Sequence, residues 1–204
     1  MTDKEINILI HAERLFAEKG FEGASTREIS KAANVNVSMI AYYFGSKEKL
    51  LSKIFEYRMS ESHSFANAVL ENTELNAWEK LIQIVDLYVS RVERLRDFYL
   101  IMQREFLSVD SSSNYIHLQT SKKTFITIYK VLMEEGVKEG IFQPYPFVDY
   151  IHATISGTLF SALNSVQLYK EMYKGDADFE KTYFDNLKKH LKITLKNLLG
   201  YEDK

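Results

Sequence analysis

The chain of 204 residues carries 26 Lys and Arg against 28 Asp and Glu, and this balance excludes a protein that coats nucleic acid without sequence preference, which needs a strongly basic surface. It has no cysteine, which excludes disulfide bonds, zinc sites built on thiolates and cysteine nucleophiles. With 46% hydrophobic residues but only two prolines and eight glycines, it is expected to fold almost entirely as α-helices.

The first predicted helix lies at the N-terminus. Four apolar residues spaced at i, i+4, i+7 and i+8 share one face of this helix. Thr2 and Glu5 are expected to cap its start, and Gly20 is expected to end it. The apolar face consists of Ile8, Ala12, Leu15 and Phe16.

A second, shorter helix is predicted directly after residue 25. Ser25 stands three residues before Glu28, the spacing of a capping box, in which each side chain satisfies a backbone N–H that the helix leaves open. Ile29, Ala32 and Ala33 follow at i, i+3 and i+4 and are expected to share a buried face. The two alanines allow the next helix to approach closely.

A tight turn and a third short helix follow. Asn34 is expected to take a left-handed backbone conformation in the turn, because Asn tolerates it better than most other residues with a side chain. Asn36 is the expected N-cap of the third helix, in which Ile40 and Phe44 face inward. Two helices joined in this way form a helix-turn-helix, whose second helix enters the major groove of DNA. The outer faces of that helix then carry Val37, Ser38, Met39, Ala41, Tyr42 and Tyr43.

The next helix is expected to begin with a cation. Gly45 ends the preceding helix, and Ser46 is placed to cap the new one. Lys47 then lies in the first turn, where the helix dipole disfavours a positive charge by roughly 0.3–1 kcal/mol. A nearby phosphate explains this cation better than helix stability does, so a DNA contact is predicted here.

The remaining chain is expected to form long helices with few interruptions. A capping box at Asn76 and Glu79 opens a helix that runs through Tyr88. The clearest turn after it is Val-Asp-Ser-Ser-Ser at 109–113, and Gly140 with the Pro-Tyr-Pro segment at 144–146 forms a loop. The other predicted helices cover residues 47–72, 114–139, 147–173 and 178–199.

Residues 8 to 50 share an extended pattern with a known family. The pattern begins as ILIHAERLFAEKGFEGASTREISKAANV, continues through a short helix ending in Tyr42-Tyr43-Phe44, and closes with GSKEKL. In these positions the chain resembles the DNA-binding domain of TetR-family transcriptional regulators. The resemblance implies an all-α fold with an N-terminal three-helix helix-turn-helix DNA-binding domain, residues 1–50, and a C-terminal helical ligand-binding and dimerisation domain, residues 51–204.

The resemblance also implies which side chains touch DNA. Thr26 and Arg27, at the start of the second helix, are expected to reach phosphates and sometimes a base. Ala41 replaces a frequent tyrosine and leaves a surface for a thymine methyl group, while Asn34 replaces the usual turn glycine. The expected base-reading residues are Val37, Ser38 and Met39, and the expected backbone-contacting residues are Tyr42, Tyr43 and Lys47.

The last two predicted helices are candidates for a dimer interface. The penultimate one carries small residues, which permit close helix approach, and the last one has a broad face of leucines. In the TetR family the corresponding helices resemble half of a four-helix dimer bundle. Packing within one chain is the alternative, and a membrane-surface role for the lysines opposite the leucines is a further one. The candidate interface residues are Ser156, Gly157, Phe160, Leu187, Leu191 and Leu195.

The middle helices are where family analogy places a small-molecule pocket. Aromatic residues at helical spacing also suit an ordinary core, and a lone histidine is usually structural. The many tyrosines favour a largely apolar ligand with a few polar groups. The candidate lining residues are Phe98, Tyr99, Met102, Phe106, His117, Tyr129, Met133, Tyr150 and Phe160.

Motifs of common enzymes are absent from the chain. It has no HExxH, no glycine-rich phosphate loop and no GxSxG turn, and its five histidines are not spaced as ligand pairs. No catalytic residue, metal site or cofactor is therefore expected. No apolar run reaches 18 residues and no signal-peptide pattern occurs, so a cytoplasmic protein without membrane contact is expected.

Together these patterns favour a sequence-specific DNA-binding regulator. The leading hypothesis is a homodimeric repressor that a small, largely apolar inducer releases from a palindromic double-stranded operator. One alternative is a DNA-bound interaction protein that needs no ligand and recruits a protein partner. Another is an activator built on the same domain.

Overall fold

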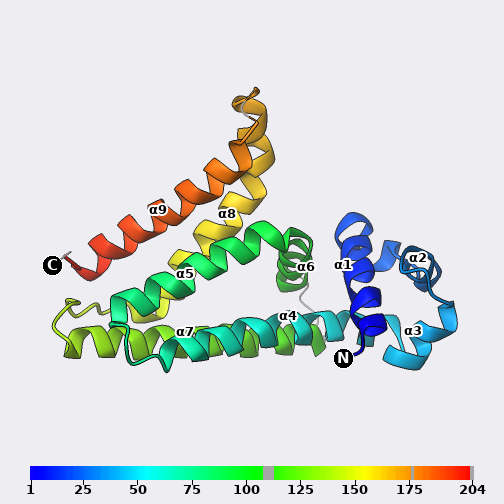
Figure 1. The fold of residues 1–204 in the computed structure, drawn as a ribbon, viewed down its shortest axis with the longest axis horizontal. Coiled ribbons are helices and arrows are strands. Elements are labelled where there is room, and N and C mark those ends of the chain that lie inside the picture. Colours follow the sequence, from blue (N-terminus) through cyan, green and yellow to red (C-terminus); the bar gives the residue numbers. More distant parts are fainter. Residues whose placement is uncertain (108–112, 176, 203–204) are drawn as a thin grey trace. The chain divides into compact units, whose positions relative to one another are not determined.

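Helices make up the regular structure of the chain. The computed structural model describes residues 1–107, 113–175 and 177–202, and within these ranges every regular element is helical (Figure 1). This confirms the all-α fold expected from the sequence. None of the described helices combines the length and the apolar character that crossing a membrane requires. The elements are α1 (Asp3–Gly23), α2 (Thr26–Ala32), α3 (Val37–Phe44), α4 (Lys47–Leu70), α5 (Ala77–Arg94), α6 (Arg96–Leu107), α7 (Ser113–Lys138), the 3₁₀ helix η1 (Val148–Tyr150), α8 (Ile151–Met172) and α9 (Phe179–Leu199).

The chain divides into two compact units. The first unit comprises residues 1–63 and 95–122, and the second comprises residues 64–94 and 123–204. The first unit therefore holds α1, α2, α3 and α6, and the second holds α5, α8 and α9. The long helices α4 and α7 each contribute residues to both units.

The observed helices follow the expected ones closely, with one break that the sequence did not indicate. The capping box at Asn76 and Glu79 is present, with Asn76 Oδ1 accepting from Glu79 N at 3.0 Å. The helix that opens there ends at Arg94, and α6 begins directly after Leu95, where neither glycine nor proline occurs. Of the turn expected at 109–113, only Ser113 lies within the described residues, where it begins α7.

The first unit is built around α1. The predicted apolar stripe is confirmed, since Ile8, Ala12 and Phe16 are fully or almost fully buried. Gly20 breaks the helix with a φ of 76° and a ψ of 168°, but it does not end the helix as expected, because a last helical turn runs on to Gly23. The helix packs against α2 and against α6. Two hydrogen bonds reinforce the α6 contact, because Arg104 donates to the carbonyl oxygens of Phe16 and Ala17 at 3.2 and 2.7 Å.

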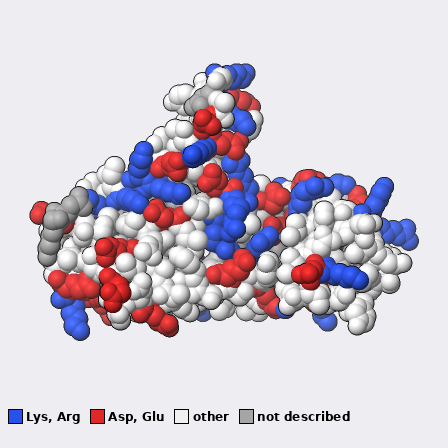
Figure 2. Space-filling model, in the orientation of Figure 1, with Lys and Arg blue, Asp and Glu red and all other residues white. Residues whose placement is uncertain are grey.

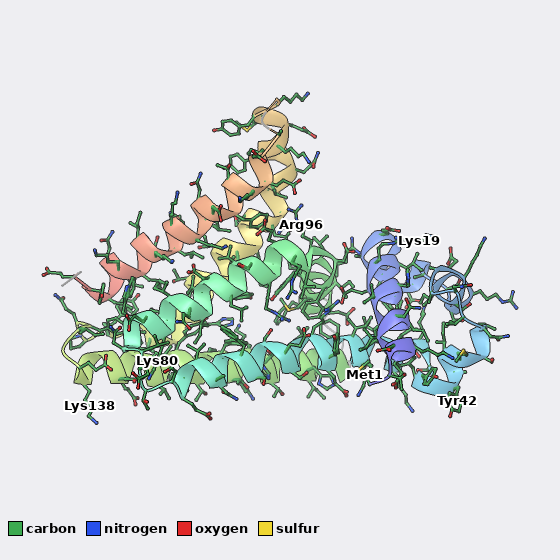
Figure 3. The ribbon with its side chains drawn as sticks, viewed as in Figure 1. Met1, Lys19, Tyr42, Lys80, Arg96 and Lys138 are labelled. Atoms are coloured by element: carbon green, nitrogen blue, oxygen red, sulfur yellow. The ribbon has the colours of Figure 1, made fainter. Side chains whose placement is uncertain are left out.

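The second unit is built around three helices, α5, α8 and α9, which pack pairwise. Leu191 and Leu195 of α9 and Leu159 of α8 are fully buried in this core. An ion pair joins α5 to α7 in this unit, where Lys80 of α5 pairs with Glu135 of α7 (Figure 3).

A buried ion pair joins α1 to α4 within the first unit. Arg58 donates from Nε and Nη2 to the two carboxylate oxygens of Glu13, at 2.8 and 3.1 Å. Both side chains are almost completely withdrawn from solvent. Burial raises the pKa of Glu13 above its ordinary value, although Arg58 acts in the opposite direction. The pair therefore holds the two helices together only while both partners are present.

Replacing Arg58 with Met should destabilise the chain by about 3 kcal/mol at neutral pH, because it leaves the Glu13 carboxylate buried without its cation. A carboxyl group with a raised pKa binds its proton more tightly in the folded chain, so its contribution to stability falls as pH rises through that pKa. The loss should therefore be smaller at pH 5 than at pH 7. Urea unfolding at both pH values measures it.

The matched control is Lys53→Met, which removes a solvent-exposed pair with Glu56 on the same helix. Exposed pairs contribute little, so this variant should change stability by less than about 1 kcal/mol at either pH. Equal losses in the two variants would contradict a structural role for the buried pair.

Candidate nucleic-acid interface

The start of α2 has the capping box that its sequence predicts. Ser25 Oγ accepts from Glu28 N at 3.2 Å, and Glu28 Oε2 accepts from Ser25 N at 3.0 Å. Lys19 donates to the other Glu28 oxygen at 2.6 Å. The hydrogen bond from Lys19 and those from Ser25 lower the pKa of Glu28 to about 2. The carboxylate therefore stays ionised and keeps the start of α2 capped at physiological pH.

The turn between α2 and α3 has the geometry of a helix-turn-helix. Asn34 has a φ of 52°, which confirms the expected left-handed conformation. The turn is closed by a hydrogen bond from Val35 N to Ser30 O at 2.9 Å. The side chain of Asn7 on α1 donates to Ala33 O at 2.7 Å and holds the turn from outside. Sequence reasoning missed Asn7, because no local pattern links it to a residue 26 positions away.

The helix α3 presents an apolar inner face and a mixed outer face. Ile40 and Phe44 are buried, as expected, and Asn36 caps the helix by accepting from Ser38 N at 2.9 Å. On the outer side Val37 is 43% exposed and Tyr42 is 81% exposed. Figure 3 shows Tyr42 pointing away from the ribbon. The ring of Tyr42 packs edge-on against Tyr43, with 5.1 Å between the ring centroids.

The other residues predicted to contact DNA differ in their exposure to solvent. Arg27, Ser38 and Ala41 are exposed, whereas Thr26 and Met39 are half-buried. On the face seen in Figure 2, the surface over α1–α3 is mostly uncharged, with separate acidic and basic side chains in place of one basic patch. Because this surface has no continuous basic patch, binding to DNA phosphates would depend on a few individual Lys and Arg side chains.

The structure supplies a second reason for the cation at the start of α4. Lys47 Nζ donates to Phe21 O at 2.9 Å and to Ala24 O at 3.3 Å. It also lies over the Phe21 ring, 4.3 Å from the centroid. These contacts tie α4 to the segment that joins α1 to α2. An ammonium group has three N–H donors, so one remains for a phosphate beyond the two carbonyls.

Comparison with known proteins identifies this arrangement. Residues 8–54 match the model of the family described as bacterial regulatory proteins, tetR family. The chain belongs to the TetR family. It is a helix-turn-helix transcriptional regulator, and the match spans α2, the turn and α3 together with most of α1 and the start of α4.

Relatives extend the TetR-family similarity over most of the chain. The "Probable HTH-type transcriptional regulator YttP" of Bacillus subtilis (strain 168) is 29% identical over 188 residues, which are 89% of this chain and 88% of that protein. The fold resembles the ketosteroid transcriptional regulator KstR2 of Mycobacterium tuberculosis, with a TM-score of 0.77 at 19% identity over 100% of this chain and 97% of that one. It also resembles the regulator FadR of Bacillus subtilis in complex with stearoyl-CoA, with a TM-score of 0.68 at 20% identity over 89% and 96% of the two chains.

The candidate pocket residues fall into both units. In the first unit, Phe98 and Tyr99 are buried and in edge-on contact, and Met102 is buried as well, while Phe106 and His117 are half-buried. In the second unit Tyr129 and Met133 are buried and Phe160 is half-buried, whereas Tyr150 is exposed. Within the second unit the ring of Tyr129 lies 6.2 Å from that of His152. Pocket lining therefore stays a prediction for these residues.

The candidate dimer residues are mostly buried within the single chain. Leu191 and Leu195 have no exposed surface, and Leu187 and Ser156 have little. These four pack inside the second unit, which is the alternative that the sequence left open. Only Gly157 is exposed, and Phe160 is half-buried. Contact with a second copy stays a prediction for these two positions.

Replacing Lys47 with Met should lower the stability of the chain by about 2 kcal/mol, because it removes a charged donor from the carbonyl oxygens of Phe21 and Ala24. Thermal and urea unfolding measure the loss. Lys49→Met is the matched control, since Lys49 is exposed two residues further along the same helix. Unchanged stability in the Lys47 variant would contradict the structural contact.

Proposed function

We propose that this TetR-family regulator is a homodimeric repressor that binds a palindromic operator through α3 and is released by a small, largely apolar ligand. The observation that supports this proposal most directly is the outer face of α3. That face presents Val37, Ser38 and Tyr42 to solvent from a helix whose inner side is buried. A helix with an exposed, uncharged outer side suits the shape of the major groove, where base edges are read.

In this proposal the side chains divide into two roles. Val37, Ser38 and Met39 at the start of α3 face base edges, and Ala41 leaves room for a thymine methyl group. The other contacts position the protein on the sugar-phosphate backbone and carry no sequence information. These positioning residues are Thr26, Arg27, Tyr42, Tyr43 and Lys47.

An exposed stripe on α8 supports association with a second copy. Exposed residues recur along this helix at a spacing of three or four, so they lie on one face. Leu168 and Met172 on this stripe are 59% and 65% exposed, and Ile193 on α9 is 61% exposed. The stripe consists of Ala153, Gly157, Ser161, Asn164, Leu168 and Met172, and the exposed Tyr150 of η1 precedes it. Small and apolar residues together allow two helices to approach closely, as a dimer bundle requires.

The proposed ligand class draws support from the structural relatives. One is named as a ketosteroid regulator, and another was solved with stearoyl-CoA, so one name refers to an apolar ring system and the other to a long apolar acyl chain joined to the polar, anionic coenzyme A. A ligand that prefers a dimer geometry in which the two α3 helices no longer match adjacent grooves would release the operator. The coupling free energy needed for such release is typically about 1–3 kcal/mol.

The deciding experiment is selection of bound fragments from genomic DNA of the source organism, followed by sequencing. Recovery of one or a few palindromes with half-sites about one helical turn or slightly more apart supports the dimeric regulator. Absence of any enriched sequence from folded, dimeric protein would overturn the proposal. A thermal-shift screen with fatty acyl-CoA and steroid ligands then tests the ligand class, since ligand at 100 times its Kd adds about 2.7 kcal/mol.

Tyr42→Ala should weaken binding to the selected operator and to unrelated DNA by similar factors, because this side chain is expected to touch the backbone. Lys47→Met should lower the slope of log affinity against log salt by about 0.9 for each phosphate contact that it removes. Electrophoretic mobility shifts at several salt concentrations measure both effects. Unchanged operator affinity in both variants would contradict the placement of these residues.

Leu168→Glu should convert the dimer to a monomer and abolish tight operator binding, because it puts a charge into a desolvated helix contact. Sedimentation equilibrium gives the mass directly. The control is Val131→Glu, an equally drastic change at an exposed apolar residue on α7 outside the stripe. A Leu168 variant that stays dimeric would place the interface elsewhere.

A further inference from the structure

The start of α3 contains a pair of side chains whose hydrogen bonds decide what the helix can offer to a base. Asn36 Oδ1 accepts two hydrogen bonds from Ser38, one from the backbone N and one from the hydroxyl Oγ, both at 2.9 Å. Both residues are exposed, so they are available to a partner on the outer side of the helix.

The backbone contact determines the direction of both bonds. A backbone N–H can only donate, so the atom that it meets on Asn36 must be the carboxamide oxygen and not the nitrogen. A carboxamide oxygen has no hydrogen, so the Ser38 hydroxyl must be the donor in the second bond. The hydroxyl hydrogen is therefore directed at Asn36, and the Ser38 oxygen presents only lone pairs to the outside.

The neighbouring candidates for base reading offer few hydrogen-bonding groups to a base. Val37 has no polar side-chain atom, and the Met39 thioether is a weak acceptor on a half-buried side chain. Among the three residues at the start of α3, Ser38 thus carries the one strong hydrogen-bonding group. Whether the Ser38 hydroxyl accepts or donates therefore decides which bases can form a hydrogen bond with the start of α3.

We propose that Asn36 holds Ser38 as a hydrogen-bond acceptor, so that Ser38 selects a base with an amino group in the major groove. Adenine N6 and cytosine N4 are the donors on that edge, whereas guanine O6 and N7 and thymine O4 are acceptors. A keto group opposite Ser38 would place two acceptors face to face unless the hydroxyl left Asn36. This inference rests on the proposed function, because it needs α3 to lie in the major groove.

The expected discrimination is modest and specific to one position of each half-site. A single neutral hydrogen bond changes the preference by roughly threefold to tenfold. The preference should therefore appear as one column of the operator at which adenine or cytosine is favoured and which responds to Ser38. The other columns should not change with this residue.

Selection from a randomised half-site library compares the wild-type protein with three variants. Ser38→Ala keeps the backbone cap on Asn36 Oδ1 and should lose the preference at one column by roughly threefold to tenfold. Asn36→Asp keeps an acceptor oxygen for the hydroxyl, so it should keep the preference even though its negative charge weakens binding to every sequence. Val37→Ala changes a neighbouring base-reading position, so it should alter a different column and leave the one that responds to Ser38 unchanged.

Asn36→Ala supplies the converse test, because it frees the hydroxyl to donate. Guanine or thymine should then become acceptable at the column that responds to Ser38. Circular dichroism and thermal unfolding check that each variant is folded, since loss of an N-cap destabilises the helix that it starts. If the Asn36→Ala variant does not fold, the comparison of Ser38→Ala with Asn36→Asp still tests whether Ser38 acts as an acceptor.

The outcomes separate this inference from the proposed function. A wild-type operator in which the Ser38-dependent column favours guanine or thymine would overturn the inference alone. An operator that is identical for wild type and Ser38→Ala would do the same. Failure of the wild-type protein to enrich any sequence would overturn the proposed function and this inference with it.

Discussion

The position of α3 is the constraint on which the function of this protein depends. An isolated helix shorter than about 12–15 residues is marginal in water, and α3 has eight residues. Its stability must come from contacts outside itself. Burial of Ile40 and Phe44 holds one face, Asn36 caps the start, and Gly45 ends the helix with a φ of 80°. These contacts hold the outer face of a short helix in one orientation.

The end of α1 is the second point at which the first unit is held together. Arg104 of α6 donates to the carbonyl groups of Phe16 and Ala17, and Lys47 of α4 donates to those of Phe21 and Ala24. Gly20 lies between the two sets and breaks the helix, which leaves several carbonyl groups without helical partners. Two cations from other helices satisfy them. The same segment thus joins α6 and α4 to the helices that lead into the helix-turn-helix.

In the second unit, burial decides which residues are available to a partner. The leucines of α9 form the core with α5 and α8, so the face that looked suited to a second copy is already used. The exposed stripe of α8 mixes small residues with Leu168 and Met172. A helix with one buried and one partly apolar exposed face can pack within its own chain and against another chain at once.

Features that depend on a few neighbouring residues could be predicted from the sequence. The capping boxes, the left-handed Asn34, the cap at Asn36 and the inward-facing Ile40 and Phe44 all follow from spacings of two to four residues. The all-α fold and the membership of the TetR family follow from composition and from the pattern between residues 8 and 50. The ends of α4, α7 and α9 were predicted closely, whereas the residues after Pro146 form η1 and α8 begins only at Ile151.

Only the tertiary structure decided the contacts between distant residues. The bonds of Asn7 to the turn, of Lys47 to the end of α1 and of Arg58 to Glu13 join positions 23 to 45 residues apart. The break at Leu95 has no local signal. Periodicity indicates that a helix has an apolar face, but two helices with similar faces can pack in more than one way. Which face is buried depends on the shape of the whole core, and a local pattern does not contain that information.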